Sequence, residues 1–176
     1  MTDEMIMEAV KNGNLQQASV LFERYHKRLF NFLARMTFDK EAAEDLTQNV
    51  FLRMLKYRNS YREGAKFQSW IYQMARNVFA DYYQESKTKN RVVKMETVPD
   101  RIDEKENDWE QQERTLELSM QKLSEEQKEL LVMTRFQHMK YEEVAEIMNT
   151  TVANIKVKVH RAINKLREHY FEFEQI

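Results

Sequence analysis

Glycine and proline are so scarce in this chain that their scarcity largely decides its fold class. Among 176 residues there are 2 glycines, Gly13 and Gly64, and 1 proline, Pro99. Tight turns and β-hairpins depend on these residue types, which supply backbone angles that other residues avoid. Charged residues make up 32% and hydrophobic residues 42% of the sequence, which suits amphipathic helices. The sequence therefore predicts an all-α fold.

Apolar residues recur at helical spacing throughout the N-terminal half of the chain. This period predicts helices over residues 3–12, 15–36, 40–56 and 67–87. We expect Gly13 to end the first helix, Asn14 to cap the second and Asp39 to cap the third. Residues 57–66 lack any period and predict an ordered loop. The side chains expected to pack inward are Leu15, Ala18, Phe22, Tyr25, Leu29, Phe32, Leu33, Met36, Ala43, Leu46, Val50, Met54, Trp70, Ile71, Met74, Val78, Phe79 and Tyr82.

The composition changes after the fourth predicted helix. Residues 93–114 are rich in Asp and Glu, contain Pro99 and hold few apolar residues, which is typical of a flexible linker. Beyond them, Ser124 and Gln127 have the spacing of a capping box that opens a further helix. We therefore expect two small helical domains, residues 1–92 and 115–176, joined by an acidic linker.

Residues 141–170 have the pattern of a helix-turn-helix motif. A short amphipathic helix ends at Asn149, and Thr151 is placed to cap a longer second helix. Val152, Ile155, Val159, Ile163 and Leu166 form one apolar stripe on the second helix. The basic residues Lys156, Lys158, Arg161, Lys165 and Arg167 fall off this stripe. A basic outer side is how a recognition helix meets the major groove of DNA, although a plain solvent-facing surface has the same appearance.

Nothing in the sequence has the pattern of a catalytic or metal site. The chain has no cysteine, its 4 histidines are scattered, and it lacks a glycine-rich phosphate loop. We therefore expect a binding protein without a cofactor rather than an enzyme. The absence of cysteine and of a signal peptide favours a reducing, cytosolic compartment, and no apolar run is long enough to span a membrane. The net charge of -1 says nothing by itself, because a nucleic-acid binder needs only a local basic patch.

A second group of residues raises the odds of nucleic-acid binding. Between residues 53 and 83, aromatic side chains alternate with arginines and lysines. Aromatic rings stack on unpaired bases while cations follow phosphates. We expect Phe67, Trp70 and Tyr82 to belong to the core, and Tyr61 and Tyr72 to be exposed.

These segments, in this order, resemble a bacterial sigma factor of the extracytoplasmic-function (ECF) group. AEDLTQNVFLRMLK at 43–56 is similar to the segment that docks on the RNA polymerase clamp. SYREGAKFQSWIYQMARNVFADYYQ at 60–84 is similar to the segment that melts and reads the −10 promoter element. LSEEQKELLVMTRFQHMKYEEVAEIM at 123–148, followed by the basic helix, resembles the region that reads the −35 element.

The resemblance implies a sigma factor that brings core RNA polymerase, through the clamp of its beta-prime subunit, to promoter DNA. It assigns Lys156, Lys158 and Arg161 to the −35 duplex. It assigns Arg53, Tyr61, Lys66, Arg76 and Asn77 to the melted −10 strand, and Asp45, Leu46, Gln48 and Phe51 to the clamp, although Phe51 is equally compatible with the core. An anti-sigma factor, often membrane-anchored, is a usual partner in this family. The acidic linker either threads near the polymerase active centre or is a simple spacer.

The sequence also departs from the family pattern. Ala153 and Asn154 replace a usual Gly-Thr pair, and Val157 replaces a serine between two basic residues. Asn49 replaces a glutamate in the clamp segment, and Lys140 stands where a serine or threonine usually caps the first helix of the motif. We therefore expect an unusual −35 preference. Two other hypotheses remain: a stand-alone helix-turn-helix transcriptional regulator, and an interaction protein whose basic helix binds acidic partners.

Overall fold

The computed structural model describes residues 1–89 and 107–174, and within these two stretches all regular structure is helical. The helices are α1 (Asp3–Lys11), α2 (Ala18–Thr37), α3 (Lys40–Lys56), α4 (Phe67–Lys89), α5 (Asp108–Gln121), α6 (Glu125–Leu131), α7 (Tyr141–Ile147) and α8 (Val152–Glu174). Short 3₁₀ turns occupy Leu15–Gln17 and Arg58–Ser60, and α6 continues into a π-helical turn at Val132–Phe136. Of the predicted linker, residues 93–106 lie outside the described residues, and 108–114 belong to α5.

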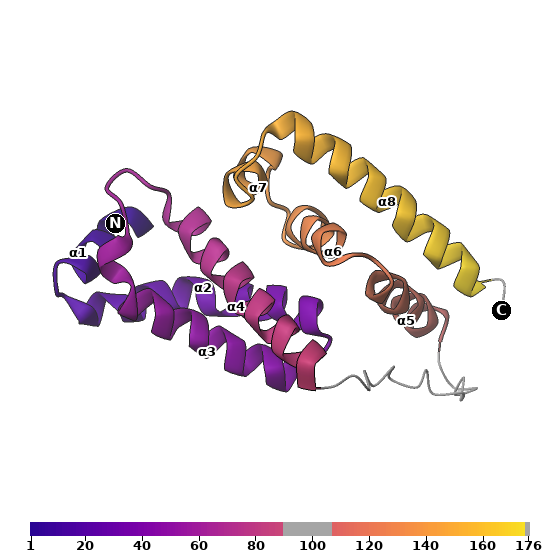
Figure 1. The fold of residues 1–176 in the computed structure, drawn as a ribbon, viewed down its shortest axis with the longest axis horizontal. Coiled ribbons are helices and arrows are strands. Elements are labelled where there is room, and N and C mark those ends of the chain that lie inside the picture. The colour runs from indigo at the N-terminus through magenta and orange to yellow at the C-terminus, as the bar shows by residue number, and fades with distance from the viewer. Residues whose placement is uncertain (90–106, 175–176) are drawn as a thin grey trace.

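The helices form two bundles that pack against each other (Figure 1). In the N-terminal bundle α2, α3 and α4 pack side by side, and α1 lies across one end against α2 and α4. In the C-terminal bundle the long helix α8 runs along α5, α6 and α7. The bundles meet where α4 contacts α7 and where α2 contacts α6 and the π-helical turn.

Local capping signals in the sequence explain most of the helix ends. Gly13 follows α1 with φ 106, a left-handed conformation that glycine adopts without strain. The carboxylate of Asp39 accepts hydrogen bonds from the backbone N–H groups of Glu41 and Ala42, as predicted. The predicted capping box of Ser124 and Gln127 is also present. The prediction for Asn14 is wrong, because its side chain makes no capping bond and a 3₁₀ turn precedes α2.

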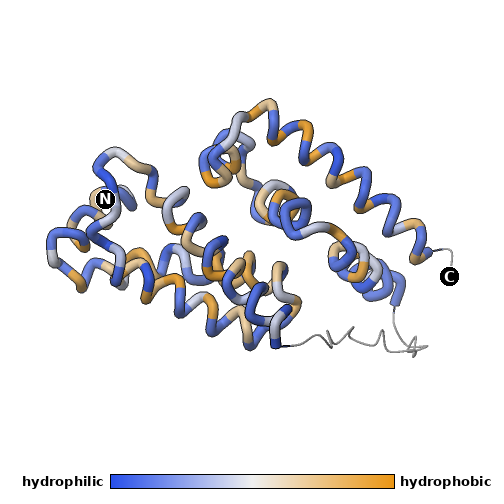
Figure 2. Tube along the Cα trace, in the orientation of Figure 1, coloured by the Kyte–Doolittle hydropathy of each residue, from blue (hydrophilic) through white to orange (hydrophobic). Residues whose placement is uncertain are grey.

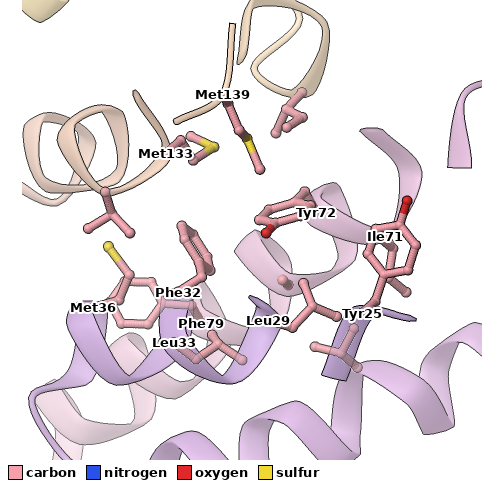
Figure 3. Close-up of a cluster of buried hydrophobic side chains, with 14 of the residues drawn as sticks. Tyr25, Leu29, Phe32, Leu33, Met36, Ile71, Tyr72, Phe79, Met133 and Met139 are labelled. Carbon is pink, nitrogen blue, oxygen red and sulfur yellow. The ribbon is translucent and has the colours of Figure 1, made fainter. Parts of the chain in front are cut away.

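One hydrophobic core runs through both bundles. Figure 2 shows hydrophobic positions recurring along each helix, as the helical period requires. At the junction, Phe32, Leu33 and Met36 of α2 and Tyr72 and Phe79 of α4 gather beneath Met133 and Met139 (Figure 3). All seven side chains are buried. The two bundles therefore bury apolar surface against each other, in addition to the surface that each buries internally.

Two residues predicted for the core lie at the surface instead. Leu15 and Phe22 are both exposed. Phe22 stacks on His26 with ring centroids 4.7 Å apart and meets Phe51 edge-on at 4.9 Å. Its position on the apolar stripe of α2 was read correctly, but Phe51 of α3 covers only part of its ring.

Candidate nucleic-acid and polymerase interfaces

The turn between α7 and α8 is built by short polar side chains. Asn149 ends α7 with φ 55, a left-handed conformation that asparagine tolerates better than most residues. The hydroxyl oxygen of Thr151 accepts a hydrogen bond of 3.1 Å from the backbone N–H of Asn154, so the predicted cap is confirmed. The Asn154 amide also donates to the hydroxyl of Thr150 at 2.7 Å. Asn154 therefore stabilises the turn and is not free to read a base.

The second helix of the motif has one buried side and one basic, exposed side. Ile155, Val159 and Ala162 are fully buried, whereas Val152, Ile163 and Leu166 are half-buried. Lys156 and Arg161 are exposed, and within the described residues neither is bound to a carboxylate. Val157 lies between them and is 48% exposed. The predicted stripe is correct in its direction, and the opposite side of α8 is available to a partner.

Lys158 differs from its neighbours because it already has a partner. Its ammonium group lies 2.5 Å from a carboxylate oxygen of Glu126 at the start of α6. Both side chains remain partly exposed, with relative exposures of 36% and 50%. Such an exposed pair stabilises the protein little. Lys158 must, however, exchange this carboxylate for a phosphate before it can contact DNA.

The loop over residues 57–66 is closed by Tyr61, and this differs from the sequence-based expectation. Tyr61 was predicted to be exposed, but only 1% of it is accessible. Its hydroxyl donates a hydrogen bond to the carbonyl oxygen of Ala65, and its ring meets Trp70 edge-on at 5.2 Å. Burial, followed by the nearby Glu4 and Glu8, raises the pKa of Tyr61 to about 12. Tyr61 holds the loop together and offers no free face for stacking in this structure.

The expectation for Tyr72 is wrong for another reason. Tyr72 is 0% exposed, and its hydroxyl donates to Oε1 of Gln137 at 2.8 Å. Burial raises its pKa to about 12. Gln137 belongs to the other bundle, so the sequence of α4 alone does not predict that Tyr72 is buried beneath it. Of the three aromatic residues predicted for the core, Phe67 is buried, but Trp70 and Tyr82 are only half-buried.

The remaining residues assigned to the −10 strand lie along α3, α4 and the loop that precedes α4. Arg53 of α3 is bound to Asp81 of α4, with 2.9 Å between Nη2 and the carboxylate. Asn77 is exposed one turn before Asp81. Lys66 and Arg76 form ion pairs with Glu146 and Glu129 of the C-terminal bundle, at 3.5 Å and 3.0 Å. The structure thus brings these residues to neighbouring helices, but with carboxylates beside three of them.

The polymerase residues assigned on α3 separate into two kinds. Asp45 and Gln48 are exposed, whereas Leu46 and Phe51 are buried. Phe51 therefore belongs to the core, which was one of its two predicted places. Leu52 was not singled out, yet it is 65% exposed one turn after Gln48. Its position off the apolar stripe of α3 could have been read from the sequence, although a single exposed leucine is common on protein surfaces.

A groove of about 1000 Å³ lies between α2 and α5. Its lining includes Phe30 and Arg35 of α2, Trp109 and Leu116 of α5, and Phe136 of the π-helical turn. The guanidinium of Arg35 lies 3.8 Å from the centre of the Phe136 ring, and burial lowers the pKa of Arg35. Trp109 is exposed and was placed in the linker by its acidic neighbours. The groove was not predicted from the sequence, because it forms only where residues of the two bundles meet.

Among residues 1–89 and 107–174 no helix is both long and apolar enough to cross a membrane. The same stretches hold no cluster of three or more histidines or carboxylates arranged to bind a metal ion.

Comparison with known proteins places both bundles. Residues 21–88 match the family model "Sigma-70 region 2", and residues 113–166 match "Sigma-70, region 4". The ECF RNA polymerase sigma factor SigM of Bacillus subtilis is 29% identical over 153 residues, covering 85% of this chain and 93% of that protein. RNA polymerase sigma factor YlaC of the same organism is 27% identical over 156 residues, covering 85% of this chain and 89% of that protein.

The fold is also similar to solved structures. CnrH, in complex with the cytosolic domain of CnrY, gives a TM-score of 0.72 at 16% identity, covering 94% of this chain and 95% of that one. The sigma factor RpoE from Bartonella quintana, in complex with the anti-sigma factor NepR, gives 0.66 at 21% identity, covering 86% and 94%. At these identities the likeness shows the fold.

A helix-turn-helix with an exposed basic side, packed on a second helical bundle, has the features of a DNA-binding transcription protein. The two region models and the curated relatives make the class specific. The chain belongs to the ECF group of the sigma-70 family of RNA polymerase sigma factors. It is a promoter-directing initiation factor and not an enzyme.

Proposed function

We propose that this sigma factor divides promoter recognition between its two bundles. The C-terminal bundle, from α5 to α8, holds duplex DNA at the −35 element, and the N-terminal bundle, from α1 to α4, holds the melted −10 strand. The observation that carries this proposal is the exposure of Lys156 and Arg161 opposite the buried Ile155 and Val159. A helix with one anchored side and one cationic side can enter a major groove without losing its own core.

At the −35 element, the cations of α8 supply phosphate and base-edge contacts. Lys156 and Arg161 are exposed, and Lys158 joins them after leaving Glu126. Phosphate contacts provide affinity and fix the register, whereas contacts to base edges provide specificity. Val157, exposed between the cations, cannot hydrogen-bond a base but can pack on a thymine methyl group.

At the −10 element, we assign Asn77 and the cations Arg53, Lys66 and Arg76 to the separated strand. Asn77 is exposed and has both a donor and an acceptor for a base edge. Tyr61 takes part indirectly, since it fixes the shape of the loop over residues 57–66 through Ala65 and Trp70. A flipped base costs a few kcal/mol to unpair, and a preformed pocket beside this loop would offset part of that cost.

The polymerase clamp would bind the outer side of α3. Asp45 and Gln48 are the exposed members of the predicted set, and Leu52 adds an apolar contact on the same side. Leu46 and Phe51 lie beneath them and keep α3 in position.

We also propose that the protein acts in the cytoplasm, where polymerase and promoters are, and that an anti-sigma factor regulates it. RpoE was solved with an anti-sigma factor, which supports an inhibitor for this chain. A membrane anchor on such an inhibitor is a prediction from the family alone.

Run-off transcription tests the proposed function. Purified core RNA polymerase is mixed with the protein and a set of genomic fragments from the source organism, and transcripts are mapped. We expect transcripts with defined start sites that require both proteins. No promoter-dependent transcript, together with duplex binding in the absence of polymerase, would instead identify a stand-alone regulator. The absence of any DNA contact would identify an interaction protein.

A further inference from the structure

The second half of the loop over residues 57–66 is held at both ends by α1. Nζ of Lys11, the last residue of α1, donates a hydrogen bond of 2.6 Å to the backbone carbonyl oxygen of Tyr61. Oε1 of Glu4, in the first turn of α1, accepts a hydrogen bond of 3.2 Å from the backbone N–H of Phe67, where α4 begins. Figure 1 shows α1 at the same end of the N-terminal bundle as this loop.

The two contacts come from one side of α1. Glu4 and Lys11 are seven residues apart, which is two turns of an α-helix and about 10.5 Å along its axis. Loops are more mobile than helices, so a rigid element here sets the positions of Tyr61 and Phe67. The carboxylate of Glu4 also lies at the N-terminus of α4, where the helix dipole favours a negative charge.

The helix α1 is itself fixed to the rest of the bundle. The carboxylate of Asp3 accepts a hydrogen bond from the hydroxyl of Tyr25 and lies 2.7 Å from Nη1 of Arg24, and both partners belong to α2. Three side chains on the inner side of α1 are buried in the hydrophobic core: Ile6, Met7 and Val10. The loop is therefore tied to α2 through α1.

Tyr61 is the residue on which these contacts converge. Lys11 binds its carbonyl oxygen, and its hydroxyl donates to the carbonyl oxygen of Ala65. Its ring packs edge-on against Phe67 and Trp70, with centroids 6.5 Å and 5.2 Å away. The loop thus has a defined conformation before any DNA is bound, and Lys11 is the one of these partners that lies outside the loop and α4.

We propose that α1 sets the conformation of the −10 loop, with Glu4 and Lys11 as positioning residues for base recognition. The match to region 2 begins at residue 21, so the matched segment does not include α1. The two side chains act by holding the loop in the shape that accepts a flipped base, since a preorganised site spends less binding free energy on ordering itself. This inference rests on the proposed function and names residues that prepare its −10 site.

Four variants test the two hydrogen bonds. Glu4→Ala removes the acceptor, and Lys11→Met removes the donor while keeping most of the side-chain length. Glu4→Gln keeps an acceptor oxygen, and Lys11→Arg keeps donors. Glu23→Ala and Lys27→Met, at exposed positions of α2, make the same substitutions away from the loop and are the matched controls.

One measurement is made on the free protein and one on the holoenzyme. Hydrogen exchange followed by nuclear magnetic resonance on the full chain reports how tightly each backbone amide of the loop is held. Run-off transcription with core RNA polymerase uses a mapped promoter with each base placed in turn at each −10 position. It gives the ratio of transcript from the preferred base to transcript from the others. A loss of folded protein lowers all transcripts together and leaves this ratio unchanged.

We expect the Phe67 amide to exchange at least about fivefold faster in Glu4→Ala, which corresponds to the loss of one ordinary hydrogen bond. The amides of Tyr61 and Ala65 should do the same in Lys11→Met. In both variants the base preference at one −10 position should fall at least about fivefold, the lower range of what one base contact supplies. The conservative variants and the controls should keep the wild-type exchange and preference, and −35 duplex binding should be unchanged throughout.

Each contrary result has its own meaning. Unchanged exchange in Glu4→Ala and Lys11→Met would overturn the hold of α1 on the loop. Faster exchange with an unchanged base preference would overturn its role in recognition. Equal losses in Lys11→Met and Lys11→Arg would overturn the hydrogen bond as the cause. A wild type that gives no promoter-dependent transcript would overturn the proposed function itself, whereas hydrogen exchange would still report on the loop.

Discussion

The hydroxyl of Tyr72 donates a hydrogen bond of 2.8 Å to Oε1 of Gln137, and Nε2 of Gln137 donates at 2.8 Å to the carbonyl oxygen of Arg28. One side chain of the C-terminal bundle thereby links α4 to α2. Gln137 follows the π-helical turn, and its backbone N–H donates a hydrogen bond to the carbonyl oxygen of Val132, five residues earlier. The π-helical turn therefore places the side-chain amide of Gln137 within hydrogen-bonding distance of both α4 and α2.

Gln137→Ala should therefore loosen the junction of the bundles. The buried hydroxyl of Tyr72 loses its acceptor, which costs about 1–3 kcal/mol in free energy of unfolding. Urea denaturation followed by tryptophan fluorescence measures the loss, with Gln121→Ala on the exposed end of α5 as the control. In the Tyr72→Phe background the cost of Gln137→Ala should shrink, and an unchanged cost would contradict the coupling.

The stability that Glu129 contributes should rise as the pH falls. Burial raises the pKa of Glu129, opposed by Arg76 of α4 and assisted by Glu125 and Glu126 of α6. Because this pKa is higher in the folded protein than in the unfolded chain, the folded protein binds the proton more tightly. The contribution is fully present below the ordinary glutamate pKa and is lost as the pH rises through the raised value. The free energy of unfolding, measured by urea denaturation at several pH values, should therefore contain a component that decreases from acidic pH towards neutrality.

Glu129→Gln provides the control for this pH dependence. It keeps an acceptor for Arg76 but cannot titrate, so this component of the pH dependence of unfolding should disappear. If Glu129→Gln follows the same pH profile as the wild type, another group governs the change.

The cap of the recognition helix is a local contact with a distant effect. Thr151→Ala removes the oxygen that accepts from the N–H of Asn154 and should cost about 1 kcal/mol of stability. Fraying of the first turn of α8 should also weaken binding to −35 duplex DNA, measured by gel shift beside thermal unfolding. Thr151→Ser keeps the oxygen and should behave like the wild type. Equal losses in both variants would assign the effect to the methyl group instead.

Features that depend on neighbouring residues were predicted well from the sequence. Asp39, Ser124 and Thr151 cap their helices as expected, because a cap involves a side chain and a backbone N–H two or three residues away. The basic side of α8 also followed from the period alone. In the site, the exposed Asn77, Lys156 and Arg161 were foreseen for the same reason.

Features that depend on contact between the bundles were not predicted. Tyr72 has an acceptor 65 residues away, and Arg76 has a carboxylate 53 residues away. No local pattern encodes such partners, so Tyr72 was expected at the surface. Phe22 shows the reverse error: its helical position suits the core, but His26 and Phe51 cover only part of its ring and it stays exposed. Periodicity predicts which side of a helix a side chain faces, but not whether another element packs over it.

The two DNA contacts should separate in experiments. Lys156→Ala should weaken −35 duplex binding and reduce the slope of log affinity against log salt by about 1, as for one lost phosphate contact. Lys158→Ala should weaken it less, because Lys158 must first leave Glu126. Asn77→Ala should leave −35 binding intact and impair strand opening, followed by permanganate reactivity of thymines with core polymerase. Loss of −35 binding in Asn77→Ala would contradict the division of labour.

Val157 should make the −35 preference sensitive to a single methyl group. It is exposed between Lys156 and Lys158, and an apolar side chain in the major groove gains most from the methyl of thymine. Replacing each −35 thymine in turn by deoxyuridine removes that methyl and nothing else. At one position the wild type should lose about 0.8 kcal/mol, the value of one buried CH₂ group, or roughly fourfold in affinity.

The matching protein change is Val157→Ala, which removes the two methyl groups that would touch the base. In this variant thymine and deoxyuridine should bind equally at the sensitive position, while the other positions keep their wild-type response. Val157→Ser should lose the methyl preference too and gain tolerance for bases that offer a hydrogen-bond partner. A methyl preference that survives in Val157→Ala would move the contact to another residue of α8, and Ala153, exposed one turn earlier, would be the first to examine.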